Sequence, residues 1–107
     1  DERTYHIEPP PGMVMEAEEF FAKMDADMDK GWQMSRQWVE SPDRFQRCQI
    51  AADKLMMAHS EGNDILVKLM AAYMLSRLPG IVGVRVNTEG EMTETELVMG
   101  SVDGEGQ

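Results

Sequence analysis

Asp64-Ile-Leu-Val-Lys-Leu-Met-Ala-Ala-Tyr-Met-Leu-Ser-Arg-Leu78 is the most apolar stretch of the chain. Asn63-Asp64 can cap the start of a helix and Pro79-Gly80 ends one, so these signals predict a helix over residues 64–78. After Asp64, its apolar surface is interrupted only by Lys68, Ser76 and Arg77. A helix that is apolar nearly all round has to be covered nearly all round. The cover must come from the rest of the chain or from another chain.

A longer helical pattern precedes this segment, over residues 14–40. Apolar side chains recur there at the spacing of one broad helix face. The members of this face are Ala17, Phe20, Phe21, Met24, Met28, Trp32, Trp38 and Val39. Polar side chains line the other side. The pattern predicts one long amphipathic helix, in which Gly31 either allows another backbone to approach closely or marks a bend.

Ser41-Pro42-Asp43 is a strong start signal for a second helix. The serine suits the cap, the proline suits the first helical position, and the acid favours the first turn. Gly62 ends this helix, which therefore covers residues 42–61. One of its faces is apolar. Ile50 and Met57 project from the other side and form a small apolar patch that a partner could contact.

The segment after Pro79-Gly80 predicts a β-hairpin with strands over residues 81–87 and 92–99, because both runs are β-branched or alternating. A two-residue turn at Glu89-Gly90 would set the register. In that register, Arg85 opposes Glu94 as a cross-strand ion pair. The opposite face of the first strand is apolar and carries Val82, Val84 and Val86.

These elements predict a mainly α fold. It is a three-helix bundle of residues 14–40, 42–61 and 64–78, with a C-terminal β-hairpin of residues 81–87 and 92–99. A chain of 107 residues fits one domain, here residues 13–100.

The two ends of the chain lie outside this predicted domain. Residues 1–12 end in Pro9-Pro10-Pro11-Gly12 and predict an extended N-terminal arm. Tyr5 and Ile7 would be the apolar contacts of this arm with a neighbouring subunit. Residues 101–107 are rich in glycine and acids and predict a disordered tail.

The chain is strongly acidic, since 20 acidic against 10 basic side chains give a formal net charge of −10. This charge repels phosphate backbones and anionic membrane surfaces and attracts basic partners, so we expect neither nucleic-acid nor membrane binding. No apolar run approaches the roughly 20 residues of a membrane-spanning helix. The single cysteine, Cys48, excludes an intramolecular disulfide and favours a cytoplasmic location.

The sequence contains no recognisable catalytic, phosphate-binding or dinucleotide-binding motif. Cys48 and His59 lie about 16 Å apart along the second predicted helix, which is too far for a Cys–His pair. The acidic run that begins at Asp25 fails as a calcium loop, because Gly31 comes one position late and Arg36 stands where the last ligand, a glutamate, is needed. We therefore expect no catalytic residue, no cofactor and no metal site.

The leading functional hypothesis is a small acidic accessory or adaptor protein that binds another protein through Met- and aromatic-rich helical faces. Eleven methionines suit adaptable interfaces, and an apolar groove lined by such side chains would accept an amphipathic helix. We also expect a homodimer, because the predicted elements cover much but not all of helix 64–78. The candidate partner-binding residues are Ile50, Met57, Val67, Met70, Met74 and Leu78.

Two alternatives stay open. One is an inhibitor that imitates nucleic acid, with the carboxylates of residues 16–29 standing in for phosphates. The other is a small ligand-binding or enzymatic module with a pocket near Trp32 and Trp38.

Overall fold

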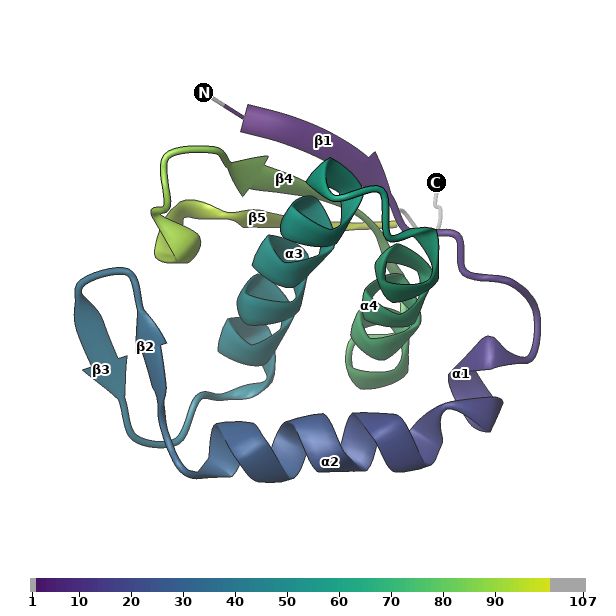
Figure 1. Ribbon diagram of the computed structural model, residues 1–107, viewed down its shortest axis with the longest axis horizontal. Coiled ribbons are helices and arrows are strands. Elements are labelled where there is room, and N and C mark those ends of the chain that lie inside the picture. Colours follow the sequence, from purple (N-terminus) through teal and green to yellow (C-terminus); the bar gives the residue numbers. More distant parts are fainter. Residues whose placement is uncertain (1, 101–107) are drawn as a thin grey trace.

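The antiparallel helices α3 (Arg44–Ser60) and α4 (Asp64–Arg77) form the middle layer of the computed structural model, which describes residues 2–100 (Figure 1). A three-stranded antiparallel sheet covers one side of this pair, and helix α2 (Glu18–Asp29) crosses the other side (Figure 1). Of the described residues, 51% are helical and 22% are in strands. The fold is therefore mixed α/β, and the predicted mainly α three-helix bundle with a C-terminal hairpin is wrong.

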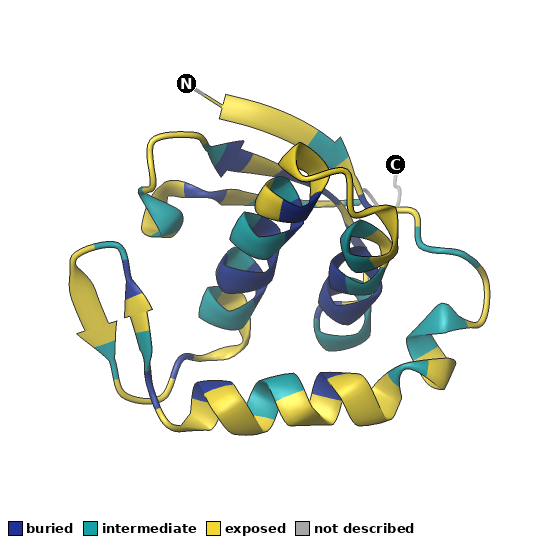
Figure 2. Ribbon diagram, in the orientation of Figure 1, coloured by how far each residue is buried: buried dark blue, intermediate teal, exposed yellow. Residues whose placement is uncertain are grey.

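Helix α4 begins and ends close to where the sequence signals predict. The Asn63 side chain accepts a hydrogen bond of 3.1 Å from the backbone N–H of Leu66, and the helix ends at Arg77. Its middle is buried continuously from Met70 to Met74. The cover comes from the same chain, because the core cluster also contains Phe21 and Met28 of α2, Ile50 and Leu55 of α3, and Val84 and Val86 of the sheet. Figure 2 shows these buried segments gathered on α3, α4 and the sheet, while the outer side of α2 is exposed.

The N-terminal residues form strand β1 (Glu2–His6) and are not a free arm. β1 pairs antiparallel with β4 (Ile81–Asn87), which also pairs with β5 (Glu96–Met99), so the strand order is β1–β4–β5. Ile7 is buried in the chain's own core. The Tyr5 ring packs edge-on against the His59 ring, with 5.5 Å between the two ring centres. The arm was predicted because the pairing partner of these residues lies near the other end of the chain, where no local signal identifies it.

The predicted helix over residues 14–40 is divided into shorter elements. α1 (Met13–Glu16) is separated from α2 by Ala17, and a two-stranded hairpin of β2 (Trp32–Met34) and β3 (Gln37–Val39) follows α2.

Gly31 is the physical reason for the break after α2. Its φ of 105° lies in the left-handed region that commonly ends helices. Beyond it, Met34 is buried while Gln33 is exposed. Trp32 and Met34 of β2 therefore follow the two-residue period of a strand, whereas Trp38 lies on the exposed face of the hairpin opposite Gln33.

Helix α3 begins at Arg44 rather than at residue 42, because Asp43 and not Ser41 caps it. The Asp43 carboxylate accepts a hydrogen bond from the Gln46 N–H, and the Gln46 side chain accepts one from the Asp43 N–H, both at 2.8 Å. This reciprocal capping box satisfies two backbone donors that would otherwise lack partners.

The C-terminal hairpin exists, but its register differs from the prediction. A short 3₁₀ helix, η1 (Met92–Glu94), occupies the first part of the predicted second strand, so β5 begins only at Glu96. Arg85 consequently pairs with Glu96 rather than with Glu94, and their side chains form an ion pair of 2.7 Å. The connection is longer than the predicted two-residue turn.

An irregularity in β4 between Ile81 and Gly83 changes the side-chain alternation at the start of the strand. Val84 and Val86 are buried, as the predicted apolar face requires, whereas Val82 is exposed. The predicted disordered tail, residues 101–107, lies outside the described residues.

Replacing Gly31 with Ala should lower the free energy of unfolding by at least about 2 kcal/mol. A left-handed backbone costs a residue with a Cβ roughly 1–2 kcal/mol. The new Cβ would also lie 2.3 Å from the Trp38 ring. Gly62→Ala is the matched control, because Gly62 has a φ of 74° but open space around its Cβ position, so it should lose only about 1 kcal/mol. Urea denaturation measures both losses, and equal losses would contradict the account of Gly31.

Candidate functional site

Helix α2 has three sides with different surroundings, because successive residues are rotated by about 100° around the helix axis. Its central side chains, Phe21 and Met28, are buried in the core. One flank is acidic and contacts arginines. The other flank is apolar and lines a groove. The acidic flank consists of Glu18, Asp25 and Asp29, and the apolar flank of Phe20 and Met24.

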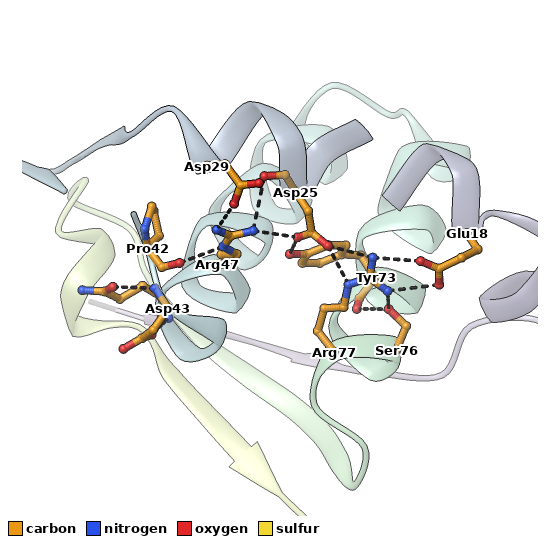
Figure 3. Close-up of polar contacts among 10 residues, drawn as sticks. Glu18, Asp25, Asp29, Pro42, Asp43, Arg47, Tyr73, Ser76 and Arg77 are labelled. Carbon is orange, nitrogen blue, oxygen red and sulfur yellow. Dashed lines mark hydrogen bonds and ion pairs between the residues drawn. The ribbon is translucent and has the colours of Figure 1, made fainter. Parts of the chain in front are cut away.

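Asp25 is the centre of the contacts on the acidic flank (Figure 3). Its Oδ2 accepts hydrogen bonds from Arg77 Nε at 2.9 Å and Nη2 at 2.8 Å. Its Oδ1 lies 3.3 Å from Arg47 Nη1 and also accepts a hydrogen bond from the Tyr73 hydroxyl. Arg47 lies in the first turn of α3, whereas Tyr73 and Arg77 lie in the last turns of α4. One carboxylate therefore joins three helices, in an arrangement that we call the Asp25 clamp.

Two further acids pair with the arginines of the Asp25 clamp, so that three carboxylates surround two guanidinium groups. Glu18 accepts hydrogen bonds from Arg77 Nη1 at 3.1 Å and Nη2 at 2.9 Å, and Asp29 pairs with Arg47 (Figure 3). The Arg77 guanidinium carbon also lies over the Tyr73 ring, 5.2 Å from the centre of the ring. Glu18 and Asp29 are exposed, whereas Asp25 and both arginines are largely buried, so the Asp25 pairs differ from exposed surface ion pairs of little energetic consequence.

The Asp25 clamp shifts the pKa values of Asp25, Glu18 and Tyr73. Burial, the largest single effect, raises the pKa of Asp25, but hydrogen bonds from Tyr73, Arg77 and Arg47 outweigh it, so the pKa is lowered overall. A hydrogen bond from Arg77 lowers the pKa of Glu18. Burial and the hydrogen bond to Asp25 raise the pKa of the Tyr73 hydroxyl. The carboxylates stay ionised and the phenol stays protonated at neutral pH, which suits a structural contact.

Asp25→Asn should lower the free energy of unfolding at pH 7 by about 2 kcal/mol or more, because it leaves two largely buried arginines without their shared carboxylate. Asp27→Asn, on the same helix, is the control and should change stability by no more than about 0.5 kcal/mol. Urea denaturation of both variants beside the unaltered protein measures the losses.

The effect of Asp25→Asn should also depend on pH. The folded-state pKa of Asp25 lies below its unfolded value of about 3.9. Its contribution is therefore complete above about pH 5 and is lost as the pH falls through the folded pKa. The stability difference between the unaltered protein and Asp25→Asn should shrink below about pH 3. A difference at about pH 2 as large as that at pH 7 would contradict this role of the carboxylate.

The apolar flank of α2 borders a groove of about 270 Å³, which we call the apolar groove. Three helices contribute to its wall, and α2 and α4 each do so through residues one turn apart. The lining residues are Phe20 and Met24 of α2, Lys54, Met57, Ala58 and Glu61 at the edge of α3, and Leu66 and Met70 of α4. Phe20 and Met57 retain 40% and 53% of their surface exposed, so apolar area is accessible there.

A second depression, of about 520 Å³, adjoins the apolar groove. Met57 and Glu61 line both hollows and therefore form a ridge between them. The remaining lining of the second depression combines apolar surface with charged and polar groups and consists of Glu2, Arg3, Met56, Ser60 and Thr88. The accessible surface is thus an apolar hollow beside one that also carries charged side chains.

The six predicted partner-binding residues divide into two groups. Ile50, Met70, Met74 and Leu78 are buried in the core, while Met57 is exposed and Val67 is half-buried. Met57 and Met70 meet in the apolar groove, Met57 on its rim and Met70 at its base.

Sequence reasoning missed the other apolar walls of the groove, Phe20, Met24 and Leu66. Phe20 and Met24 were assigned to one broad apolar face together with Phe21. The signal that separates them is the position of Asp25 and Glu18 on the opposite flank of Phe21. Ionised side chains on one flank and apolar side chains on the other predict that only the residues between them face the core.

The expected pocket near Trp32 and Trp38 is very small. The hollow beside Trp32 measures about 40 Å³, and Met24, Asp27, Met28 and Lys54 also line it. Trp38 does not line it, because its ring lies over Gly31. Such a volume holds about one water molecule and admits no substrate.

Chemically reactive groups are not gathered in the described part of the chain. Cys48 is buried, which raises the pKa of its thiol to about 12. Within residues 2–100, no three His, Cys, Asp or Glu side chains are grouped so that they could hold a metal ion. No helix in this range is long and apolar enough to cross a membrane. Comparison with known proteins found no matching family model, no matching curated protein and no matching solved structure.

Proposed function

We propose that this chain is a small acidic protein-binding module that accepts an apolar helical segment of another protein in the apolar groove. The observation that supports the proposal is the exposed apolar lining of this groove, in which Phe20 and Met57 keep 40% and 53% of their surface exposed. Methionine side chains on both its rim and its base suit such a role, because they are flexible and can adapt to different partner surfaces.

The volume and the lining of the apolar groove favour a protein partner over a small-molecule substrate. At about 270 Å³, the groove is smaller than most sites that enclose a ligand of drug size. Lys54 and Glu61 are the ionisable groups of its lining, and they lie about two helical turns apart on α3. A reaction centre requires several catalytic groups within reach of one point, and two ionisable side chains about two turns apart do not form one.

Two other expectations have weaker support. A nucleic-acid mimic needs free carboxylates, but Glu18, Asp25 and Asp29 are paired with arginines. The homodimer stays a prediction. It was expected because part of helix 64–78 would need cover from a partner, but Met70, Met74 and Leu78 are covered within one chain. The cytoplasmic location also stays a prediction, based on the single cysteine.

A matched pair of methionine variants tests the proposed function. Met57 lies on the rim of the apolar groove and is 53% exposed, whereas Met99 lies on β5 and is 46% exposed. Met57→Asn should weaken partner binding at least about tenfold, because it leaves a polar amide in an apolar contact. Met99→Asn should leave binding unchanged.

The measurement is quantitative affinity capture from the cells that naturally make the protein, with the unaltered chain and both variants as bait. The proposed function predicts a protein that Met57→Asn loses and Met99→Asn retains. It is wrong if the unaltered chain captures no specific protein, or if both variants retain every captured protein equally.

A further inference from the structure

We infer that the occupant of the apolar groove is an amphipathic α-helix of another protein that carries lysine or arginine next to its apolar side chains. This inference rests on the proposed function, gives the reason for a helical partner segment, and adds its length and its charge. Three features of the groove carry it: the elements that build its walls, the spacing along α3, and the carboxylates around the ridge.

The walls of the apolar groove favour a helical occupant over an extended one. They are side chains of α2, α3 and α4, and the backbone groups inside these helices are already hydrogen-bonded to one another. An extended segment would bring unpaired N–H and C=O groups into the groove, where no backbone partner exists for them. A helix satisfies its own backbone and presents only side chains.

The dimensions of the groove set the length of the contact. From Lys54 on α3 to its C-cap residue Glu61, the lining extends over about seven residue steps, which correspond to about 10.5 Å along the helix axis. This distance equals about two turns of a second helix. An occupant would therefore insert apolar side chains at positions i, i+3 or i+4, and i+7, the spacing of one face of a helix.

Charge around the ridge favours a basic occupant. Glu61 borders both hollows, and Glu2 lines the second depression with it. Arg3 is the cation of that lining, so carboxylates outnumber cations there. Among the ion pairs of residues 2–100, none involves Glu2 or Glu61. A basic side chain next to the apolar face of an inserted helix would reach these carboxylates across the Met57 ridge.

Lys54 does not reverse this preference at the other end of the groove. Its ammonium group lies 4.8 Å from the centre of the Trp32 ring, and Asp27 shares the small hollow beside that ring. A cation held by an aromatic face and close to a carboxylate is partly compensated within the chain.

The overall charge distinguishes the proposed partner from a second copy of the chain. Each copy carries a formal net charge of −10, so two copies repel each other as they approach. The same charge attracts a basic segment and accelerates its encounter at low salt. We therefore assign the groove to a partner of opposite charge.

Two synthetic peptides test the inference. Each is a capped helical 14-residue peptide with leucines at the i, i+3/i+4, i+7 spacing, and the remaining positions carry lysine in one peptide and glutamate in the other. Isothermal titration calorimetry with the unaltered protein should show the lysine peptide binding at least tenfold more tightly than the glutamate peptide. Met57→Asn should weaken binding of the lysine peptide at least about tenfold, which places it in the apolar groove.

Two variants with the same net charge distinguish a direct contact of Glu61 with the peptide from the general attraction between an acidic protein and a basic peptide. Glu61→Gln should weaken binding of the lysine peptide about fivefold. Glu40→Gln is the matched control, because Glu40 is exposed, lies outside both hollows and changes the net charge by the same amount. It should weaken binding less than twofold.

The outcomes distinguish a failure of the proposed function from a failure of the inference that the partner is basic. If neither peptide binds the unaltered protein, both the proposed helix-binding function and the inference are wrong. If both peptides bind with equal affinity and Met57→Asn abolishes the binding, the function is supported and the basic partner is excluded. If Glu40→Gln weakens binding as much as Glu61→Gln, the attraction is not local and the inference is wrong.

Discussion

The carboxylate of Asp25 between Arg47 and Arg77 is the contact on which the arrangement of the helices depends. It connects the first turn of α3 with the last turn of α4 and holds α2 across both. Arg77 also lies where a positive charge suits the negative end of the α4 dipole. Arg47 is less favourably placed near the start of α3, and Asp25 and Asp29 offset its charge there.

The Asp25 clamp also determines which side of α2 remains available. Because one flank of α2 is held by arginines and Phe21 and Met28 fill the core, Phe20 and Met24 are left on the opposite flank. They meet Met57, Leu66 and Met70 there and complete the apolar groove. The same helix thus supplies the structural contact and the proposed binding surface, and the two differ only in which flank they use.

Local signals in the sequence predicted local features well. The caps around α4 give its bounds nearly to the residue, and the β-branched run gives β4. The failures concern distant contacts. β1 exists because residues 2–6 pair with β4, and the register of β5 depends on η1 and on the irregularity at Gly83. The break at Gly31 was not predicted, because Gly31 was expected either to allow a close backbone approach or to mark a bend within one helix. The apolar spacing over residues 32–39 was interpreted as a continued helix, so the hairpin was missed.

The sequence predicted the chemical character of the candidate site better than it predicted which residues form the site. An apolar groove lined by Met and aromatic side chains was expected, and Met57 was a candidate partner-binding residue in a separate apolar patch with Ile50. Core packing determines which other apolar side chains line the groove, because it buries Ile50 and Met74 and leaves Phe20 partly exposed. The sequence does not resolve this division, since all of these side chains lie on apolar helix faces.

Nuclear magnetic resonance of the methionine methyl groups tests the central claim most directly, namely that the apolar groove is the surface that binds a partner. Met24, Met57 and Met70 line the groove, whereas Met34 is buried elsewhere in the core and Met99 lies on β5. During titration with the lysine-bearing helical peptide, the signals of the three groove methionines should shift together, and those of Met34 and Met99 should stay in place. Shifts that are confined to Met99, or spectra without any change at saturating peptide, would contradict the account.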